Sequence, residues 1–313
     1  MQISRADVAD LIYFMAIARH RSFSRAAIEL GVSASALSHA LKGLETRLGV
    51  RLLNRTTKSV TPTAAGEELV QSVLQPFDTI EGALESLNRY RNTPTGRIRI
   101  NAAVEAANLL LAPVMPAFMD RYPDIEIDIV ASNRMVNVTD AGFDAGIRYG
   151  GTVPDAGIRY GGTVPEDMVA RRLSADIRWV IAASPDYLER YGTPEHPDDL
   201  LHHRCISNRL GDDRVYRWEL ARDGETYQMT VPGSVTVNHA ETGLVAVLGG
   251  AGLMYFPEPL VAPYVKDGRL RLVLTEWSPL EEGFHIYYSS RRQLPTGLRL
   301  LIEFIQEARP LGL

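Results

Sequence analysis

The first fifty residues contain three amphipathic segments bounded by serine and glycine, and this pattern constrains the fold more than any other feature of the chain. Apolar residues recur at helical spacing over residues 7–20. A serine can cap each of two further helices, which end at Gly31 and Gly49. The candidate caps are Ser22 or Ser24 for the first of these helices and Ser33 or Ser35 for the second. Two helices joined by a tight glycine-containing turn are typical of a helix-turn-helix.

The last of these segments, residues 33–49, separates apolar from polar side chains. Its apolar stripe consists of Leu37, Ala40, Leu41, Leu44 and Leu48. Its opposite face carries Ser35, Ser38, His39 and Lys42. A helix that is polar and basic on its outer face can enter the major groove of DNA, with its first turns at the base edges. The sequence therefore predicts a DNA-recognition helix.

The run VRLLNRTTKSVTPT, residues 50–63, reads as a short hairpin, or wing, that follows this helix. Strand-like apolar residues stand around a polar and basic tip, and Pro62 comes near the end of the run. The tip residues are Arg55, Thr56, Thr57 and Lys58. A basic tip of this kind can lie against phosphates or in the minor groove.

Charge is distributed unevenly along the chain. Residues 1–66, which we call the head, hold nine Lys and Arg against four Asp and Glu, a net charge of +5. The remaining residues hold 24 against 34, a net charge of −10, and the whole chain carries −5. A basic head followed by an acidic body is expected when only one module contacts phosphate. The alternative is an ordinary solvated surface.

Length and composition limit the class of protein. With 313 residues, of which 45% are hydrophobic, the chain is expected to form two or three domains. No apolar run approaches the roughly 20 residues that span a membrane, and the N-terminus does not read as a signal peptide. The lone cysteine, Cys205, excludes a disulfide framework and a cysteine zinc site. These features are typical of a cytoplasmic protein.

The run SFSRAAIELGVSASALSHALKGLETRLGVRLLNRTTKSVTPTAAG closely resembles the head of the LysR-type transcriptional regulators. The alanine pair Ala26–Ala27, the LGVS turn, the L-E-x-x-L-G-V-x-L-x-x-R run and T-x-A-G all stand in the family's places. The body also follows the family's order of segments, so the resemblance covers the whole chain.

The resemblance implies a sequence-specific DNA-binding regulator rather than an enzyme, with an α/β fold in three parts. These parts are a winged helix-turn-helix over residues 1–62, a linker and dimerisation helix over 63–92, and an effector-binding domain over 93–313. The effector domain resembles periplasmic binding proteins, with subdomain I at about 93–172 and 278–313 and subdomain II at about 173–277. Implied partners are double-stranded promoter DNA, a small-molecule effector, copies of the same chain in a homodimer or homotetramer, and RNA polymerase. The implied location is the cytoplasm, in association with the nucleoid.

By the same resemblance, the DNA contacts come from the recognition helix, its turn and the wing. The predicted residues are Ser24, Ser33, Ser35, Ser38, His39, Lys42, Arg55, Thr56 and Thr57. Three of them have a second reading: Ser33 as a cap only, His39 as a surface histidine, and Arg55 as an ion-pair partner of Glu45. His39 stands where many family members carry Arg, which puts the base preference at that point in doubt.

A heptad seam is predicted over residues 63–90, where apolar residues alternate at spacings of three and four. The seam residues are Val70, Val73, Phe77, Ile80, Leu84 and Leu87. The seam either packs on its own domain or joins two chains, and its place between a head and a large body favours a dimer contact. A dimer would present two recognition helices about one DNA turn apart. Pro76 is expected to kink this helix.

From Arg97 onward, segments with strand and helix character alternate, which predicts an α/β body with mixed or parallel sheets. The body departs from the family pattern in one segment, which the family has in a single copy and this chain has twice. DAGIRYGGTVP occurs at 144–154 and again, identically, at 155–165. Such a tandem copy indicates a recent in-frame duplication or an engineered or selected variant. Residues 147–149 should lie on a strand at the edge of the cleft, and residues 158–160 could take the same place.

The effector is expected to be a small polar, even anionic, metabolite, because helix N-termini that follow strands can bind a carboxylate. By family position, the candidate residues are Glu105, Ala106, Ala107, Ser132, Asn133, Ser207, Asn208 and, near the return crossover, His239. Arg148 or Arg159 could supply positive charge. Each polar candidate has an alternative role as a cap or turn residue.

The sequence contains none of three common enzyme signatures, G-x-S-x-G, H-E-x-x-H and the P-loop. His196, His202 and His203 read as surface residues and Cys205 as a buried small residue, so no metal or cofactor is expected. A rival reading is an α/β solute-binding or catalytic domain with an incidental helical head. Another is a DNA-binding protein whose body only assembles and senses nothing.

Overall fold

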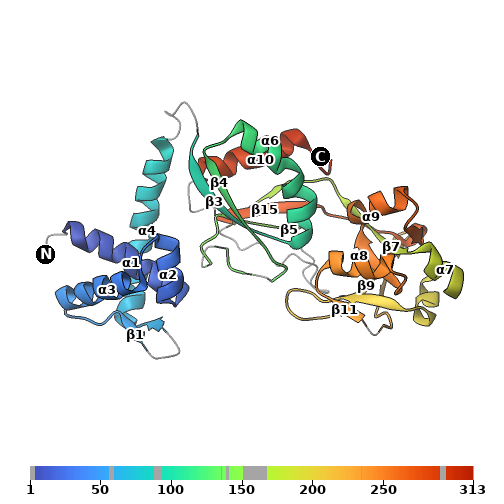
Figure 1. The fold of residues 1–313 in the computed structure, drawn as a ribbon, viewed down its shortest axis with the longest axis horizontal. Helices are drawn as coiled ribbons and strands as arrows, with labels where there is room; N and C mark the ends of the chain where they lie inside the picture. The colour runs from blue at the N-terminus through green and yellow to red at the C-terminus, as the bar shows by residue number, and fades with distance from the viewer. Residues whose placement is uncertain are drawn as a thin grey trace. The chain divides into compact units, whose positions relative to one another are not determined.

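A computed structural model describes residues 4–55, 60–87, 94–134, 136–138, 141–150, 168–233, 235–289 and 294–312. The chain divides into an N-terminal unit over residues 1–90 and a C-terminal unit over 91–138 and 143–313. Each unit is described by itself (Figure 1). Within the described ranges, no helix combines the length and apolar character needed to cross a membrane.

Three helices form the head, and their ends follow from local capping. They are α1 Arg5–His20, α2 Phe23–Leu30 and α3 Ala34–Leu48. The hydroxyls of Ser22 and Ser33 accept hydrogen bonds from backbone N–H groups in the first turns of α2 and α3, so these serines, rather than Ser24 or Ser35, are the caps. Gly31 and Gly49 end the two helices in the left-handed conformation, as the sequence predicts.

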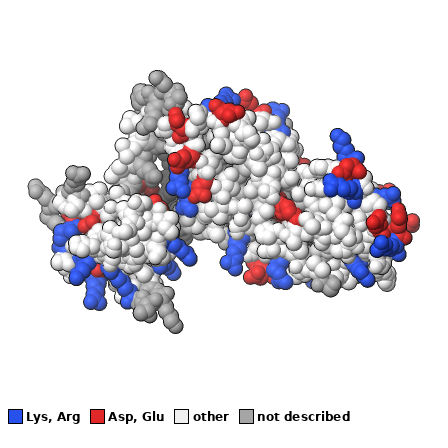
Figure 2. Space-filling view, viewed as in Figure 1, with Lys and Arg blue, Asp and Glu red and all other residues white. Residues whose placement is uncertain are grey.

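The predicted wing is confirmed as an antiparallel hairpin of β1 Leu53–Arg55 and β2 Val60–Pro62. The tip residues Thr56, Thr57 and Lys58 lie outside the described residues. Figure 2 shows Lys and Arg side chains gathered along the lower edge of the head, where Figure 1 places α3 and the wing.

The predicted linker helix is α4 Ala64–Ser86, with Pro76 inside it. It begins after Thr63, whose hydroxyl accepts a hydrogen bond from the backbone N–H of Gly66 at 3.1 Å. At its N-terminal end, Val70 packs against the apolar core of the head. Towards its C-terminal end, Ile80, Leu84 and Leu87 expose between 52% and 65% of their surface, so this chain alone does not bury that part of the predicted seam.

Lobe I of the C-terminal unit is a five-stranded mixed sheet with helices packed on it. Its strand order is β4-β3-β5-β15-β6, with β3 parallel to β4 and β5 and β15 antiparallel to β5 and β6. The strands are β3 Gly96–Ala102, β4 Ile125–Ala131, β5 Ala145–Tyr149, β6 Met168–Arg172 and β15 Phe284–Ser289. The helices are α5 Val104–Ala106, the π-helical turn η2 Ala107–Leu111, α6 Ala112–Arg121 and α10 Thr296–Ala308.

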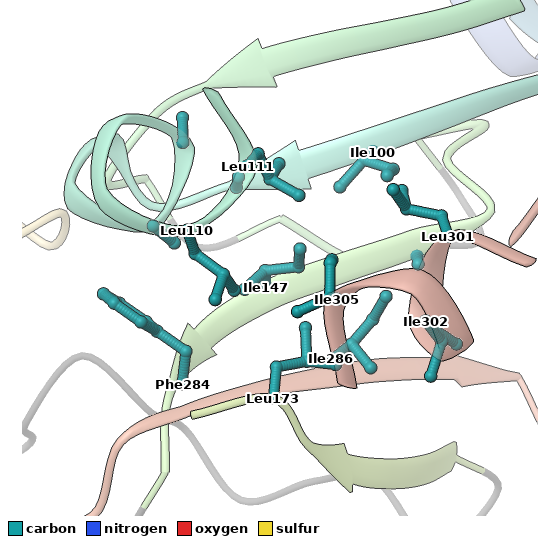
Figure 3. Close-up of a cluster of buried hydrophobic side chains, with 14 of the residues drawn as sticks. Ile100, Leu110, Leu111, Ile147, Leu173, Phe284, Ile286, Leu301, Ile302 and Ile305 are labelled. Carbon is teal, nitrogen blue, oxygen red and sulfur yellow. The ribbon is translucent and has the colours of Figure 1, made fainter. Parts of the chain in front are cut away.

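Leucine, isoleucine and phenylalanine side chains fill the core of lobe I. Figure 3 shows Leu110 and Leu111 of η2 facing Ile147 of β5, with Ile302 and further residues of α10 and β15 closing the cluster. All of these side chains are buried. This core includes buried side chains of β3 and β5, and several of the predicted effector residues lie on these two strands or directly after them.

Lobe II is built on a second mixed sheet, of strand order β11-β8-β12-β7-β13 with β14 also paired to β7. Its strands are β7 Ile177–Ala183, β8 Cys205–Asn208, β11 Val235–Val237, β12 Leu253–Pro257, β13 Arg271–Val273 and β14 Leu280–Glu281, with a separate hairpin of β9 Trp218–Arg222 and β10 Glu225–Met229. Its helices are α7 Pro185–Tyr191, η3 Pro197–His202, α8 Ala240–Leu248, α9 Glu258–Lys266 and η4 Thr275–Trp277. The expectation of an α/β body with mixed sheets is confirmed.

The chain passes between the lobes twice, at residues 173–176 and 282–283, and the two crossings are hydrogen-bonded side by side. The N–H of Leu173 donates to the carbonyl of Phe284 at 2.8 Å, and the N–H of Phe284 donates to Ser174 Oγ at 2.8 Å. A Cβ at Gly283 would lie 1.9 Å from the carbonyl oxygen of Ala175. The close packing of the two crossings therefore requires glycine at this position.

Candidate functional sites

The predicted recognition face of α3 points away from the core of the head. Ser35, His39 and Lys42 are exposed and Ser38 is partly exposed, while Leu37, Leu41 and Leu44 are buried. The Ser33 hydroxyl caps α3 through a 3.1 Å bond from the N–H of Ala36, and it also lies 2.9 Å from Ser35 Oγ. Ser24 is exposed on α2.

Arg55 fixes the wing against α3. Its guanidinium donates to Ser38 Oγ at 3.1 Å, lies 3.6 Å from Glu45 Oε2 and stacks over the Phe23 ring at 4.9 Å. The ion pair with Glu45 that the sequence left open is therefore present in the structure. Two of the nine predicted DNA residues, Ser38 and Arg55, are thus bonded to each other.

Sequence reasoning missed a second role of Glu45. Its Oε1 accepts hydrogen bonds from the backbone N–H groups of Leu52 at 2.8 Å and Leu53 at 3.2 Å. The carboxylate therefore sets where the wing begins relative to α3. A sequence signal was available, since Glu45 is the lone acidic residue of α3.

Asn133 connects the two lobes of the C-terminal unit. Its Oδ1 accepts from the N–H of Val104 in lobe I at 3.0 Å, and its Nδ2 donates to the carbonyl of Asn238 in lobe II at 3.1 Å. A second bridge runs from Asn108 Nδ2 to Glu241 Oε1 at 2.6 Å. The predicted candidates Glu105, Ala106 and Ala107 lie between Val104 and Asn108 in sequence, and all three are buried.

The remaining effector candidates fall in different surroundings. Ser132 Oγ accepts from the N–H of Arg134 at 3.2 Å, which is a turn contact. Ser207 and Asn208 are buried inside strand β8, and Asn208 Nδ2 donates to the carbonyl of Tyr255 at 3.3 Å. His239, expected near the return crossover, directly precedes α8 as its N-cap residue. Its Nδ1 is buried and has no hydrogen-bond partner among the described residues.

Arg148 lies on β5, as predicted, in the middle of the lobe I sheet. Its side chain is buried and donates to carbonyl and amide oxygens of Asn101, Ile147 and Arg134. The Nε of Arg148 has no hydrogen-bond partner among the described residues, and the same holds for the hydroxyl of Tyr287. Arg159 and the second copy of the repeat lie outside the described residues.

The Glu105 carboxyl has the most perturbed electrostatics of the predicted site residues. Burial, and to a smaller degree the charge of Glu241, raise its pKa to about 7. The backbone N–H groups of Glu105 and Ala240 and the charge of Arg148 act in the opposite direction but do not offset burial. One oxygen of Glu105 and one oxygen of Glu241, both buried, have no hydrogen-bond partner within the described ranges.

Neither Cys205 nor the histidines form a reactive cluster in the described part of the chain. Cys205 is buried, as predicted, and burial raises the pKa of its thiol to about 12, which leaves it a poor nucleophile. His203 contacts the Tyr187 hydroxyl at 3.2 Å, and no three His, Cys, Asp or Glu side chains of the described residues converge as metal ligands would.

Two protein families match this chain. The family described as "Bacterial regulatory helix-turn-helix protein, lysR family" matches residues 8–67, and the family described as "LysR substrate binding domain" matches residues 91–310. The chain is 37% identical over 302 residues to the uncharacterized HTH-type transcriptional regulator YcaN of Escherichia coli (strain K12), covering 96% of this chain and 95% of that protein. It is 36% identical over 303 residues to PgrR of the same organism, covering 96% and 97%.

Solved structures show the same fold. The full-length Vibrio cholerae virulence activator AphB superposes with a TM-score of 0.64 at 24% identity, covering 96% of this chain and 99% of that chain. CrgA, a LysR-type transcriptional regulator from Neisseria meningitidis, superposes with a TM-score of 0.59 at 27% identity, covering 98% and 99%.

Replacing Glu105 by Gln should stabilise the protein in a pH-dependent way. A carboxyl whose pKa is raised from 4.5 to about 7 on folding costs stability as the pH rises through that interval. The variant should therefore match the parent near pH 4.5 and exceed its free energy of unfolding by up to about 3 kcal/mol at pH 8. Urea unfolding at both pH values measures this difference. Glu189→Gln, at an exposed position of α7, is the control, and equal pH profiles for the Glu105 variant and the parent would contradict the assignment.

Proposed function

The chain belongs to the LysR family of bacterial transcriptional regulators, and from this premise we propose how it reads DNA, assembles and responds to an effector. It is a DNA-binding regulator with an effector-binding domain, and the rival reading of a solute-binding or catalytic domain with an incidental head is not favoured. Members of the family are generally not enzymes. They bind DNA and small-molecule effectors and form oligomers.

We propose that the exposed face of α3 reads a two-fold promoter site, with the wing against the phosphate backbone. The observation that carries this proposal is the separation of polar from apolar side chains on α3, with Ser35, Ser38, His39 and Lys42 opposite the buried leucines. Ser33 and Ser24 would contact phosphates, together with Thr56 and Thr57 of the wing tip. Arg55 would exchange its pair with Glu45 for a phosphate when DNA binds.

For assembly, we propose that the seam of α4 joins two chains and that contacts between bodies complete a tetramer. The half-exposed Ile80, Leu84 and Leu87 support the first contact, because three apolar side chains on one helical stripe gain from burial against a partner helix. Two heads would then face a two-fold DNA site in the cytoplasm, associated with the nucleoid. Contact with RNA polymerase would follow from binding at promoters.

The effector is proposed to bind between lobes I and II and to shift the equilibrium between two lobe arrangements. Support comes from the two side-chain bridges across the lobes and from the buried polar atoms without partners beside them among the described residues. We propose residues 1–62, 63–92 and 93–313 as the three functional parts. The predicted subdomain II, about 173–277, extends to Glu281, because β14 pairs with β7 of lobe II and the second crossing follows it. We propose Glu105 and Asn133 as the centre of the site, with Ser207, Asn208, Arg148 and His239 in its wider surroundings. Arg159 lies outside the described residues and stays a prediction from the sequence.

The identical copies of DAGIRYGGTVP are proposed to be an in-frame duplication that biases signalling rather than folding. The first copy contributes β5, which carries Arg148 beside the proposed site. Lengthening a loop by 11 residues costs only about 1 kcal/mol of closure entropy, so the fold should tolerate it. The alternative is a neutral surface loop.

Substitutions in the head should separate base reading from phosphate contact. His39→Ala should change the preferred base at one position, at a cost of about 1–3 kcal/mol for the cognate site. Lys42→Ala and Arg55→Ala should weaken binding to all sequences and flatten its salt dependence. Fluorescence anisotropy with operator and scrambled duplexes measures both effects, with Lys266→Ala of α9 as control. Parent-like binding by all three variants would show that the assigned face is wrong.

The double substitution Val73→Glu and Ile80→Glu should disrupt the seam, because it would bury unpaired charges between two helices. Analytical ultracentrifugation should then show loss of one dimer contact, together with weaker operator binding. Ser72→Glu with Gln75→Glu places the same charges on α4 outside the seam and should leave the assembly intact. An unchanged tetramer in the first variant would rule the seam out as an interface.

Deletion of residues 155–165 should change promoter output more than stability. A bias of only about 1.4 kcal/mol between two lobe arrangements changes their ratio tenfold. A reporter assay with and without inducer, alongside melting temperature, compares the deletion with the parent and with a version in which 155–165 is an unrelated Gly/Ser sequence. Equal output and equal inducer response in all three forms would leave the repeat as a passive insertion.

A further inference from the structure

In lobe I and α8, two of the buried polar atoms without partners among the described residues are carboxylate oxygens, which accept hydrogen bonds, whereas a site that binds a carboxylate presents donors. Glu105 of α5 and Glu241 of α8 each keep one buried oxygen without a hydrogen-bond donor among the described residues. Only 3% of the Glu105 surface is exposed. Two acceptors on opposite lobes thus lack the donors that buried carboxylates normally find.

The positive charge that acts on Glu105 belongs to Arg148, whose terminal nitrogens donate hydrogen bonds to other groups. Both terminal nitrogens of Arg148 donate to oxygens of Asn101, Ile147 and Arg134, and none of these is a carboxylate. Arg148 acts on Glu105 more weakly than Glu241 does. The nitrogen of Arg148 that has no partner among the described residues is Nε, which offers a single buried N–H, and the Tyr287 hydroxyl interacts electrostatically with this guanidinium.

We propose that the effector is a small molecule with a protonated amine, which binds between Glu105 and Glu241, and an oxygen acceptor that takes the free N–H of Arg148. This proposal rests on the interlobe effector site proposed above and replaces the anionic metabolite that the sequence suggested. An amine would supply donors to both unpartnered carboxylate oxygens and would neutralise two negative charges that repel each other across the lobes.

The amine would also tie the lobes together. Asn108 already donates to one oxygen of Glu241, and the second oxygen has no donor within the described ranges, so it can accept from a ligand without breaking that bridge. An ammonium group has three N–H donors, enough to reach both carboxylates at once. Binding would therefore favour the arrangement in which α5 and α8 lie close together.

The proposal predicts that the affinity for the amine depends on pH, because the Glu105 carboxyl must be ionised to bind a cation. The charged groups that act on Glu105 are Glu241 of α8 and Arg148 of β5, and Tyr287 of β15 in turn interacts with Arg148. Burial holds the Glu105 pKa near 7, so the carboxyl is largely protonated at pH 6 and largely ionised at pH 8. A cation binds the ionised form, so its affinity should rise about tenfold over this interval, whereas the affinity of an anion should fall.

Three probes of matched length test the charge: 3-amino-1-propanol, 3-hydroxypropanoate and 1,3-propanediol. Titration calorimetry of the full-length protein at pH 6 and pH 8 should show binding of the amine, tighter by about tenfold at pH 8. Glu105→Gln and Glu241→Gln should each abolish this binding, while Glu189→Gln should not. Melting temperatures of the variants establish that they fold.

Three results would each overturn the proposal. They are tighter binding of 3-hydroxypropanoate than of the amine, an amine affinity that changes neither with pH nor with the two substitutions, and no binding of the amine at the highest concentration at which the protein stays folded. Operator binding is measured on the same samples. If the parent protein binds its operator but not the amine, the inference about the effector fails alone. If operator binding fails as well, the proposed function fails with it.

Discussion

One side chain, Asn133, holds the two lobes of the body in register, and the proposed response to an effector depends on it. The amide uses both of its ends, accepting from Val104 at the start of α5 and donating to Asn238 just before α8. Glu105 follows Val104, and Glu241 lies three residues after Asn238. The Asn133 bridge therefore lies close in sequence to both carboxylates, whose mutual repulsion opposes the approach of α5 to α8.

In the head, the contacts of two side chains, Glu45 and Arg55, likewise hold the wing against α3. Glu45 ties the start of the wing to α3 through two backbone bonds and also faces Arg55. Arg55 in turn reaches Ser38 on the recognition face. A change of partner at Arg55 on DNA binding would therefore alter its hydrogen bond to Ser38 of α3. Phosphate contact by the wing would in this way affect the position of the side chains that read the bases.

Features governed by local chemistry were predictable from the sequence. The ends of α2 and α3 follow from capping serines and left-handed glycines, and the hairpin follows from a polar run between strand residues. The choice between Ser22 and Ser24 was not predictable, because each stands within reach of the same first turn. The two-lobed body was predictable only from the family resemblance, because composition and periodicity alone do not indicate two lobes.

The chemistry of the effector site was not predictable, because its groups meet only in the folded body. Asn108 and Glu241 are 133 residues apart, and no local pattern pairs them. Helix N-termini after strands suggested an anionic ligand, whereas the structure buries the acid Glu105, itself one of the predicted residues, at that point. Arg148 read as a charge for the ligand, yet the backbone of its own lobe takes most of its donors.

The measurement that tests the account most directly is selection of binding sites from fragmented genomic DNA by the purified full-length protein. A dimer that presents two α3 helices should enrich fragments with two half-sites related by two-fold symmetry, centred about one DNA turn apart. Removing the polar face with Ser35→Ala and Lys42→Ala together should abolish this enrichment. Enrichment of single unpaired half-sites, or an unchanged set of fragments with the double variant, would contradict the central claim that α3 reads a two-fold DNA site.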